Sequence, residues 1–495
     1  MLLSEVLKGI QTSTEYSVLN KEIDITSVAY DSREVKKGSL FIAINGTCFD
    51  GHTFIRDAIK SGAAAIMVEK NFEISDDLSV PLITVNGTRE CLSIAASNFY
   101  KRPFENFFLI GITGTNGKTT TSYLIESVLN YSKLKTGLLG TVAYRFSDEC
   151  ISSSATTPDP VTLMEIMTRM KNSEVSHVVM EVSSHALDQK RINAIPFNVG
   201  VFTNLTRDHM DYHKSFENYF QTKSLLFKNL SHTGWAVING DSDYGMSLVE
   251  MTRAKTITYG FSDKCDIQAC EVNMDIHGTK GTILSPFGKF PFSLPIPGRF
   301  NIYNALAAFT AGICAGIDAE KAAKGLSINN TIPGRLEFIP NRSGKNIFVD
   351  YSHTPDALEK AITTLRPLVS GRIITVFGCG GDRDKGKRPI MGEIAVRLSD
   401  IAILTSDNPR TEDPEKIMED ILTGIQNNSN SSCYEKKYFM EPDRQKAIFA
   451  AISMSDKNDA VLIAGKGHET YQIIGTVKQP FDDRLVALEA AEVNL

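Results

Sequence analysis

The segment GTNGKTT at residues 114–120 combines glycines with a lysine and threonines, a pattern that suits phosphate binding. It follows the short apolar run FFLIGIT and precedes SYLIESVLN, whose apolar residues have helical spacing. Backbone N–H groups in such a loop can surround phosphate oxygens, and the start of the helix adds positive potential. We therefore predict a nucleotide-binding loop, although Ile112 stands where the common G-x-x-x-x-G-K-[ST] pattern has its first glycine. The predicted loop residues are Gly114, Thr115, Asn116, Gly117, Lys118, Thr119 and Thr120.

A carboxylate and an imidazole follow two further predicted strands. Glu181 ends the apolar run in SHVVMEVSSH, and His209 lies just past the run in FNVGVFTNLTRDH. Ligands of open parallel sheets bind at the carboxyl ends of the strands, so we expect both side chains near the loop. With Thr119 and phosphate oxygens they could complete the shell of a magnesium ion. On spacing alone, a solvated loop group is the alternative for each.

The chain needs several hydrophobic cores to position these residues. At about 100 to 200 residues per domain, its 495 residues should form about three domains. β-like runs in the first part alternate with turns and short helices, and the segment KRPFEN then interrupts this pattern before FFLIGIT. After about residue 335, three strand-then-loop units follow, which read IITVFGCGGDRDKGKRP, IAILTSDNPRTEDP and AVLIAGKGHETYQ.

We therefore predict an α/β fold of three domains. Residues 1–105 should form an N-terminal α/β domain that binds a substrate. Residues 106–335 should form a central P-loop ATPase-like domain with a mainly parallel sheet, and residues 336–495 a C-terminal Rossmann-like α/β domain.

Composition and charge exclude several classes of function. The 52 basic and 58 acidic residues give a net charge of −6, so the overall balance does not favour binding to nucleic acid or to an anionic membrane. The start MLLSEVLKGI lacks the pattern of a signal peptide, and no apolar stretch reaches the roughly 20 residues of a membrane-spanning helix. The eight cysteines are scattered without a CxxC pair, which is typical of reduced thiols. We expect a cytoplasmic monomer that binds no nucleic acid and does not insert into membranes.

The segment TGTNGKTT resembles the nucleotide loop of the Mur ligases, which build the peptide stem of bacterial cell-wall precursors. The resemblance covers essentially the whole chain, and it is strongest to the family members that add meso-diaminopimelate. It implies that ATP and Mg²⁺ are cofactors. It also implies that MEVSSHAL and TNLTRDHMDYH carry the magnesium ligands Glu181 and His209, with Asn204 and Asp208 as neighbours.

Lys223, in YFQTKSLLF, has two interpretations. Among its apolar neighbours it could be a surface lysine whose stem lies along the protein. The resemblance instead matches it to the lysine that these ligases carbamylate with CO₂, so that an anionic carbamate can orient a second Mg²⁺. The implied catalytic residues are Lys118, Glu181, His209 and Lys223, and the implied metal ligands are Thr119, Glu181, His209 and carbamylated Lys223.

Two later segments resemble the family's ATP contacts. FNIYNALAA carries Asn301 and Asn304, and VDYSHTPDAL carries Asp350, Tyr351 and His353. Taken alone, the first segment is an ordinary helix start, because Asn caps helices well and the following residues favour a helix.

The resemblance also implies a site for a UDP-linked substrate. In the N-terminal domain, AYDSREVKKGSLFIAINGTCFDGHTFI would supply the uridine diphosphate contacts, although its residues alone also suit a β-hairpin with glycine turns. In the central domain, ATTPDP and SSHALDQKR would hold the muramoyl-peptide, with Arg191 paired to a carboxylate. The implied residues are Ser32, Thr47, Cys48, Phe49, Thr156, Thr157, Ser183, Gln189 and Arg191.

The segment DNPR after the strand IAILTS resembles the family signature for meso-diaminopimelate. This amino acid differs from lysine by a second carboxylate, which an arginine fork can bind with two parallel hydrogen bonds. The implied pocket contains Arg383, Asp407, Asn408, Pro409, Arg410, Gly465 and Glu469. Without the resemblance, DNPR is an ordinary turn before a helix.

The expected activity is ATP-dependent ligation through an acyl phosphate, in peptidoglycan precursor synthesis. Its substrates would be meso-diaminopimelate and the γ-carboxylate of D-Glu in UDP-MurNAc-L-Ala-D-Glu. The alternatives within the class are a lysine-adding ligase and a ligase similar to folylpolyglutamate synthetase. The alternative from another class is a P-loop switch that hydrolyses ATP without forming an amide.

Overall fold

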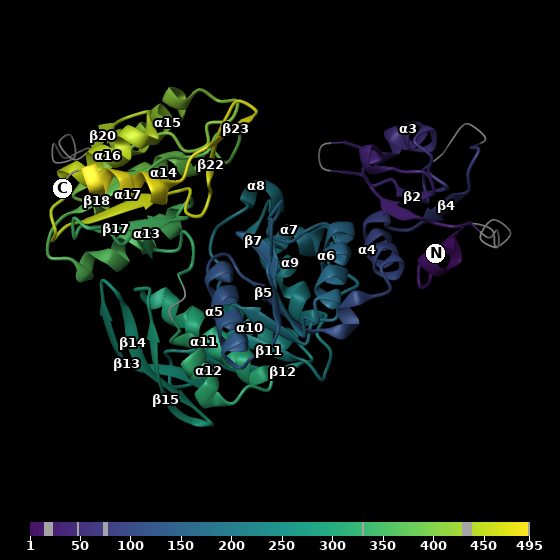
Figure 1. The fold of residues 1–495 in the computed structure, drawn as a ribbon, viewed down its shortest axis with the longest axis horizontal. Coiled ribbons are helices and arrows are strands. Elements are labelled where there is room, and N and C mark those ends of the chain that lie inside the picture. The colour runs from purple at the N-terminus through teal and green to yellow at the C-terminus, as the bar shows by residue number, and fades with distance from the viewer. Residues whose placement is uncertain (14–22, 47–48, 73–77, 329–330, 428–437, 494–495) are drawn as a thin grey trace.

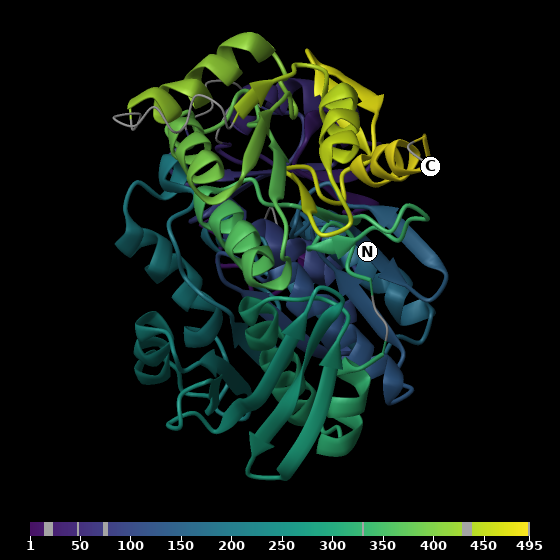
Figure 2. The same ribbon diagram turned by 90° about the vertical axis from the view of Figure 1, so that its left-hand side faces the viewer.

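The structure is a computed structural model that describes residues 1–13, 23–46, 49–72, 78–328, 331–427 and 438–493. The strands of these residues gather into sheets in the first, middle and last parts of the chain, each covered by helices (Figures 1 and 2). The middle part lies between the other two and carries an antiparallel extension at the lower left of Figure 1. The predicted fold class, three α/β domains with mainly parallel sheets, is confirmed.

The first domain contains a parallel sheet whose strand order follows the chain. Alternate side chains point to opposite faces, so Leu40 and Met67 pack toward α1 and α4, whereas Phe41 and Ile66 pack toward α3. The strands are β1 (Ser27–Ala29), β2 (Ser39–Ile42), β3 (Ala65–Glu69) and β4 (Leu82–Val85). The helices are α1 (Leu3–Val6), η1 (Ser32–Glu34), η2 (Gly51–Phe54), α3 (Ile55–Lys60), α4 (Thr88–Phe99) and η3 (Pro103–Asn106).

The central sheet has the strand order β15-β14-β13-β12-β11-β10-β5-β9-β6-β7-β8. Its middle strands are parallel, and antiparallel strands extend it at both ends. The strand β5 lies between β9 and β10, so the three carboxyl ends lie side by side. The strands are β5 (Phe108–Thr113), β6 (Thr136–Leu139), β7 (Ala143–Phe146), β8 (Glu149–Ser152), β9 (His177–Glu181), β10 (Val199–Phe202), β11 (Trp235–Asn239), β12 (Lys255–Gly260), β13 (Ile267–Asp275), β14 (Gly278–Ser285) and β15 (Gly288–Leu294).

Helices cover both faces of the central sheet and bury its apolar strands. One face packs against α5 (Lys118–Tyr131), α11 (Arg299–Cys314) and α12 (Ala319–Leu326). The other face packs against α6 (Pro160–Asn172), α7 (Ser184–Asp188), α9 (Phe216–Lys228) and α10 (Asp243–Met251), and the short α8 (Met210–His213) precedes α9. Strands buried on both faces are continuous apolar runs, which is why FFLIGIT is short and apolar throughout.

The third domain has a sheet of order β16-β17-β21-β18-β19-β20, parallel except for β16. Its helices again cover both faces. The strands are β16 (Glu337–Phe338), β17 (Asn346–Asp350), β18 (Ile373–Phe377), β19 (Ile401–Leu404), β20 (Tyr438–Met440) and β21 (Ala460–Ala464), with a separate hairpin of β22 (Tyr471–Ile474) and β23 (Val477–Pro480). The helices are α13 (Pro355–Leu365), η4 (Arg366–Leu368), α14 (Lys387–Leu398), α15 (Pro414–Asn427), α16 (Arg444–Met454) and α17 (Asp483–Val493).

Two predictions from composition can be compared with the structure. Among the described helices, none is both long and apolar enough to cross a membrane. The cysteines that the structure describes, Cys91, Cys150, Cys265, Cys270, Cys314 and Cys379, are free thiols.

A fully buried ion pair joins α16 and α17 in the third domain. Arg444 donates to Asp483 at 2.7 Å, and both side chains have 0% exposure. Replacing Asp483 with Ala would leave the guanidinium buried without its counter-charge, so we expect the third domain to lose about 3–5 kcal/mol of stability. Hydrogen exchange of the amides in β18 and β21 measures this domain separately. Lys446→Ala breaks an exposed pair on the same helix and should cost about 0–1 kcal/mol; equal effects of the two variants would contradict the prediction.

Candidate active site

The glycines of the predicted loop stand where a side chain cannot fit. The loop joins β5 to α5, which begins at Lys118. A Cβ atom on Gly114 would overlap with Thr203 Oγ1, and one on Gly117 would overlap with Asn304 Oδ1. Gly117 also has φ +86°, in the left-handed region that other residues rarely adopt. The GTNG pattern therefore follows from the close approach of β10 and α11 to the loop.

Two lysine side chains converge on one carbonyl of the loop. Lys118 Nζ donates to the carbonyl oxygens of Gly114 and Thr115, both at 2.8 Å, and Lys223 Nζ donates to the same Gly114 oxygen at 3.0 Å. Lys223 extends from α9, and only 1% of it is exposed, so it is not a surface lysine. Burial lowers the pKa of Lys118, while burial and the nearby Lys118 charge lower the pKa of Lys223 well below its usual value.

Glu181 lies at the carboxyl end of β9, directly beside the loop. Its Oε2 accepts hydrogen bonds from the hydroxyls of Thr119, at 3.1 Å, and Thr141, at 3.0 Å, and its Oε1 accepts from the Thr141 amide at 3.0 Å. A Cβ atom on Gly140 would overlap with Oε1, so a side chain at this position would displace the carboxylate. These contacts fix the carboxylate beside the first turn of α5.

His209 lines the same cleft, where it precedes α8 with φ +54°. Burial lowers its pKa to about 4, so the imidazole is neutral near pH 7 and can act as a metal ligand. Burial raises the pKa of Asp208, but the attraction of His209 and His353 outweighs it and the net pKa is low. The side chain of Asn204 bonds to both backbone polar groups of Asn116 in the loop. It accepts from Asn116 N at 3.0 Å and donates to Asn116 O at 3.1 Å.

The donor set around the loop fits a magnesium ion shared with phosphate oxygens. Thr119, Glu181 and His209 all line the cleft. Among the described residues, no group of three or more His, Cys, Asp and Glu side chains forms a metal cage. Mg²⁺ is usually held by one or two carboxylates together with phosphates and water, and these residues could hold it in that way.

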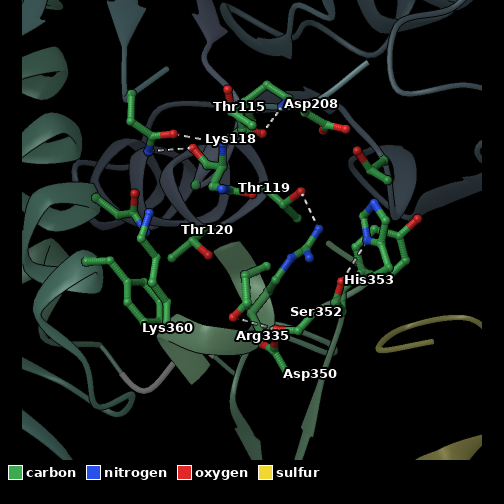
Figure 3. A pocket seen from close by; sticks show the side chains of 18 of the residues that line it. Thr115, Lys118, Thr119, Thr120, Asp208, Arg335, Asp350, Ser352, His353 and Lys360 are labelled. Carbon is green, nitrogen blue, oxygen red and sulfur yellow. Dashed lines mark hydrogen bonds between the residues drawn. The ribbon is translucent and has the colours of Figure 1, made fainter. Parts of the chain in front are cut away.

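The third domain forms the facing wall of the cleft (Figure 3). Arg335, which the predicted boundary assigned to the central domain, lies two residues before β16 of the third domain. It extends across the cleft, donates to Thr119 Oγ1 at 2.9 Å and lies 4.7 Å from the centre of the Tyr351 ring. Asp350 accepts from Leu336 N at 2.7 Å and from the Ser352 hydroxyl, and burial raises its pKa. His353 Nδ1 lies 2.8 Å from the Tyr351 carbonyl oxygen, and burial lowers its pKa.

The predicted asparagines of α11 have different positions. Asn304 lines the cleft and accepts from Thr121 Oγ1 at 3.2 Å. Asn301 is behind it and accepts from Asn304 Nδ2 at 3.1 Å. Asn301 therefore orients Asn304 and is not among the residues that line the cleft.

Several lining residues were not predicted from the sequence. They are Thr141, Phe300, Arg335, Ser352, Ala357, Lys360 and Ala361. Asp356 Oδ2 accepts from Asn116 Nδ2 at 2.8 Å and from Lys360 Nζ at 2.9 Å, which connects α13 to the loop. Asp356 lies within the quoted segment VDYSHTPDAL, but nothing in the sequence around Arg335 indicates its contact with Thr119.

A second cleft lies between the first two domains. Arg191 donates to the Thr157 carbonyl at 2.9 Å and to Gln189 Oε1 at 2.7 Å, and Thr157 donates to the Glu181 carbonyl at 2.7 Å. Thr156 lines the first cleft, so the ATTPDP segment connects the two. The residues that line the second cleft are Tyr30, Ile44, Arg89, Leu92, Ser154, Ala155, Asp159, Pro160, Gln189 and Arg191.

The other predicted residues of this substrate site are less tightly grouped. Ser183 caps α7, and its backbone N–H donates to Thr157 Oγ1 at 3.0 Å. Ser32 begins η1 and lines neither cleft, while Phe49 is 75% exposed. Thr47 and Cys48 lie outside the described residues.

The residues predicted for the amino acid come together at the carboxyl ends of β18, β19 and β21. Asn408 Nδ2 donates to Glu469 Oε2 at 2.8 Å. Arg410 donates to the Gly381 carbonyl at 2.8 Å, and a Cβ on Gly380 would lie 3.0 Å from Arg410 Nη1 and 3.8 Å from Arg383 Cγ. Gly465 leaves room for the Asp407 carboxylate, and the Pro409 carbonyl packs on Gly381. Parallel strands bring these loops to one edge, as expected.

A buried lysine that the sequence analysis did not identify supports this group. Lys466 has 0% side-chain exposure, and its Nζ donates to Asn408 Oδ1 and to Glu469 Oε2, both at 3.1 Å. These hydrogen bonds from Lys466 therefore hold the side chains of Asn408 and Glu469 in place.

Comparisons with known proteins agree with this arrangement. Family models match for the Mur ligase catalytic domain at residues 24–100, the Mur ligase middle domain at 112–312 and the Mur ligase glutamate ligase domain at 334–467. A UDP-N-acetylmuramoyl-L-alanyl-D-glutamate–2,6-diaminopimelate ligase of Clostridioides difficile strain 630 is 42% identical over 492 residues, which is 99% of each chain. The ligase of the same name in Geobacter metallireducens is 43% identical over 499 residues, covering 98% of this chain and 97% of its own.

Solved structures give the same result. A structure of a UDP-N-acetylmuramoyl-L-alanyl-D-glutamate–2,6-diaminopimelate ligase has a TM-score of 0.71 and 30% identity, covering 100% of this chain and 99% of its own. The folylpolyglutamate synthase of Mycobacterium tuberculosis shares the fold at a TM-score of 0.63 and 19% identity, over 76% of this chain and 92% of its own. The matched domains, the full-length relatives and the loop geometry together show that the chain belongs to the Mur ligase family of ATP-dependent ligases.

Proposed function

We propose that this ligase joins meso-diaminopimelate to the γ-carboxylate of D-Glu in UDP-MurNAc-L-Ala-D-Glu, in peptidoglycan precursor synthesis. The observation that carries the proposal is the grouping of Arg383, Arg410, Asn408 and Glu469 at one edge of the third domain. The Arg410 guanidinium suits the second carboxylate of meso-diaminopimelate, and the Glu469 carboxylate suits one of its ammonium groups. The full-length relatives named for this reaction support the same assignment.

The cleft around the loop would carry out the first step. A carboxylate oxygen of the substrate attacks the γ-phosphorus of ATP, the bond to the β-phosphate oxygen breaks, and an acyl phosphate and ADP form. The loop amides and Lys118 would position the phosphates, and Arg335 reaches the same place from the third domain. Bound Mg²⁺ would neutralise phosphate charge beside Thr119, Glu181 and His209.

The second step needs the amine close to the acyl phosphate. The amine nitrogen attacks the acyl carbon, the bond to the phosphate oxygen breaks, and phosphate and a proton are released. The third domain carries the proposed amino acid pocket and also contacts the loop through Arg335 and Asp356. This arrangement would bring both reactants together when the cleft is occupied.

We also propose that Lys223 is carbamylated. Carbamylation requires a neutral amine, and burial next to Lys118 lowers the pKa of Lys223 and so favours that form. The amine nitrogen bonds to the carbon of CO₂, and a proton leaves to water. The product is an anion, which would attract the Lys118 ammonium group.

Two further expectations belong to this proposal. The ligase should work as a monomer. Its ATP requirement and its free thiols suit the cytoplasm.

The ligation itself is the direct test. Enzyme, ATP, Mg²⁺ and UDP-MurNAc-L-Ala-D-Glu are incubated with meso-diaminopimelate or L-lysine, and the product is weighed by mass spectrometry. We expect an amide product with meso-diaminopimelate and ADP only when both substrates are present. Equal use of L-lysine would favour the lysine-adding alternative. A product formed from a pterin substrate and glutamate would favour a ligase similar to folylpolyglutamate synthetase. ADP formation without either substrate would favour a P-loop switch.

Lys223→Ala should lower kcat about 100-fold to 1000-fold, because it removes a charged group aimed at the transferring phosphate. Short carboxylic acids should restore part of the activity by supplying an anion. Carbon-13 NMR of the enzyme equilibrated with labelled bicarbonate should show one carbamate that the variant lacks. Lys228→Ala, on the exposed side of the same helix, is the matched control. An active Lys223→Ala variant together with no labelled carbamate would refute the proposal.

Arg410→Ala should lose about 2 to 5 kcal/mol of the preference for meso-diaminopimelate over L-lysine, the cost of truncating one partner of a buried charge pair. The ratio of kcat/KM values for the two amino acids measures the preference. Arg397→Ala, which removes an arginine with exposed ion pairs on α14, should leave the ratio unchanged. An unchanged ratio in the Arg410→Ala variant would show that Arg410 does not recognise the second carboxylate.

A further inference from the structure

Arg410 has a backbone conformation that L-residues rarely adopt. Its φ is +51°, in the left-handed region, which costs an L-residue about 1–2 kcal/mol. Two backbone hydrogen bonds to the β22–β23 hairpin hold it there. Arg410 N–H donates to the Ile473 carbonyl at 3.0 Å, and Gly475 N–H donates to the Arg410 carbonyl at 2.7 Å.

The same hairpin also holds the residues that precede Arg410. The Gln472 side chain donates to the Asp407 carbonyl at 2.6 Å, and the Ile473 N–H donates to Asn408 Oδ1 at 2.9 Å. Asn408 Oδ1 also accepts from Lys466, and Asn408 Nδ2 reaches Glu469. The hairpin is therefore bonded along the whole DNPR turn, to the backbone of its first and last residues and to the side chain of its second.

Little else in the hairpin accounts for its presence. Ile474 is 45% exposed and Val477 is 59% exposed, and all four residues of β23 are exposed. Figure 1 shows the hairpin at one end of the third domain, apart from the strands of its main sheet. A segment that buries so little apolar surface gains little stability of its own, so its bonds to the DNPR turn are its main structural consequence.

The conformation of Arg410 decides where its guanidinium lies. With φ at +51°, the side chain reaches Gly380 and Gly381. In an extended conformation the Cβ would leave the backbone in another direction, and the guanidinium would no longer reach this position. A fork that binds a carboxylate with two parallel bonds tolerates little displacement.

We infer that the β22–β23 hairpin is the specificity element of the amino acid pocket, because it holds Arg410 in the pose that meets the second carboxylate of the substrate. Gly475 and Gln472 are then positioning residues that act through Arg410. This inference rests on the proposed function. It adds residues outside the substrate pocket to those that determine which amino acid is bound.

Gly475 provides the sharpest test. It has φ +60°, and a Cβ there would meet nothing within 4 Å, so a substitution changes only the turn. Proline cannot adopt this φ and has no N–H to donate to Arg410, whereas Asn tolerates the left-handed region and keeps the donor. Gly475→Pro should lower the kcat/KM ratio of meso-diaminopimelate to L-lysine by about 10-fold to 100-fold, and Gly475→Asn should retain it.

Two further measurements separate positioning from a general loss of structure. Trapping of the acyl phosphate with hydroxylamine needs no amino acid, and its rate should be the same in wild type and in Gly475→Pro. In an Arg410→Ala background, Gly475→Pro should change the ratio little, because its effect passes through the missing arginine. Val477→Thr, on the exposed strand of the same hairpin, should behave as wild type.

The outcomes distinguish this inference from the proposed function. A wild type without preference for meso-diaminopimelate would refute the proposed function. The role of the hairpin alone would be refuted if the wild type and the Arg410→Ala variant behave as proposed and one of two further results is found. The first is an unchanged kcat/KM ratio in Gly475→Pro, and the second is a full additional loss of the ratio in the double variant. If Gly475→Pro does not fold, Gln472→Ala removes the bond to Asp407 and should lower the same ratio; an unchanged ratio there would overturn the inference.

Discussion

The side chains of Lys118 and Lys223 share the carbonyl oxygen of Gly114, and much of the active site depends on this arrangement. Lys118 and Lys223 come from different helices, and each is held where water cannot solvate it well. Buried like charges are unfavourable unless anions accompany them. Phosphate groups at the loop and a carbamate on Lys223 would both provide negative charge at this point. The same electrostatic demand thus favours nucleotide binding and modification of the lysine.

The remaining parts of the cleft surround this charge with fixed donors and acceptors. Glu181 is held by Thr119 and Thr141, so its carboxylate stays beside the loop. Arg335 contacts Thr119 from the third domain, and Asp356 contacts Asn116. These contacts tie the position of the third domain to the phosphate loop. The amino acid pocket and the phosphate site are therefore parts of one arrangement, although they are far apart in the sequence.

The sequence predicted the features that short segments determine. The run FFLIGIT followed by GTNGK predicts a strand, a loop and a helix because each step depends on neighbouring residues. The convergence of the DNPR and GKGHE segments was also predictable, since both follow strands of one parallel sheet. In contrast, Arg335 could not be found, because its partner Thr119 is 216 residues away and neither residue is unusual in its own segment. The burial of Lys223 is a similar case, since only the packing of α9 against the sheet decides whether a lysine among apolar residues is inside or outside.

Specificity in the proposed pocket would come as much from what it rejects as from what it binds. Arg410 places its guanidinium beside Gly380, and an amino acid without a second carboxylate would leave it unpaired. Rejecting such a substrate requires that this guanidinium group cannot turn away to solvent. The backbone of Arg410 is fixed by the hairpin, and Arg388 is buried behind the loop, where it donates to the Gly380 carbonyl and pairs with Glu412. Rigid support from two sides would therefore make the loss of a carboxylate costly, whereas a flexible arginine would bind both amino acids with little difference.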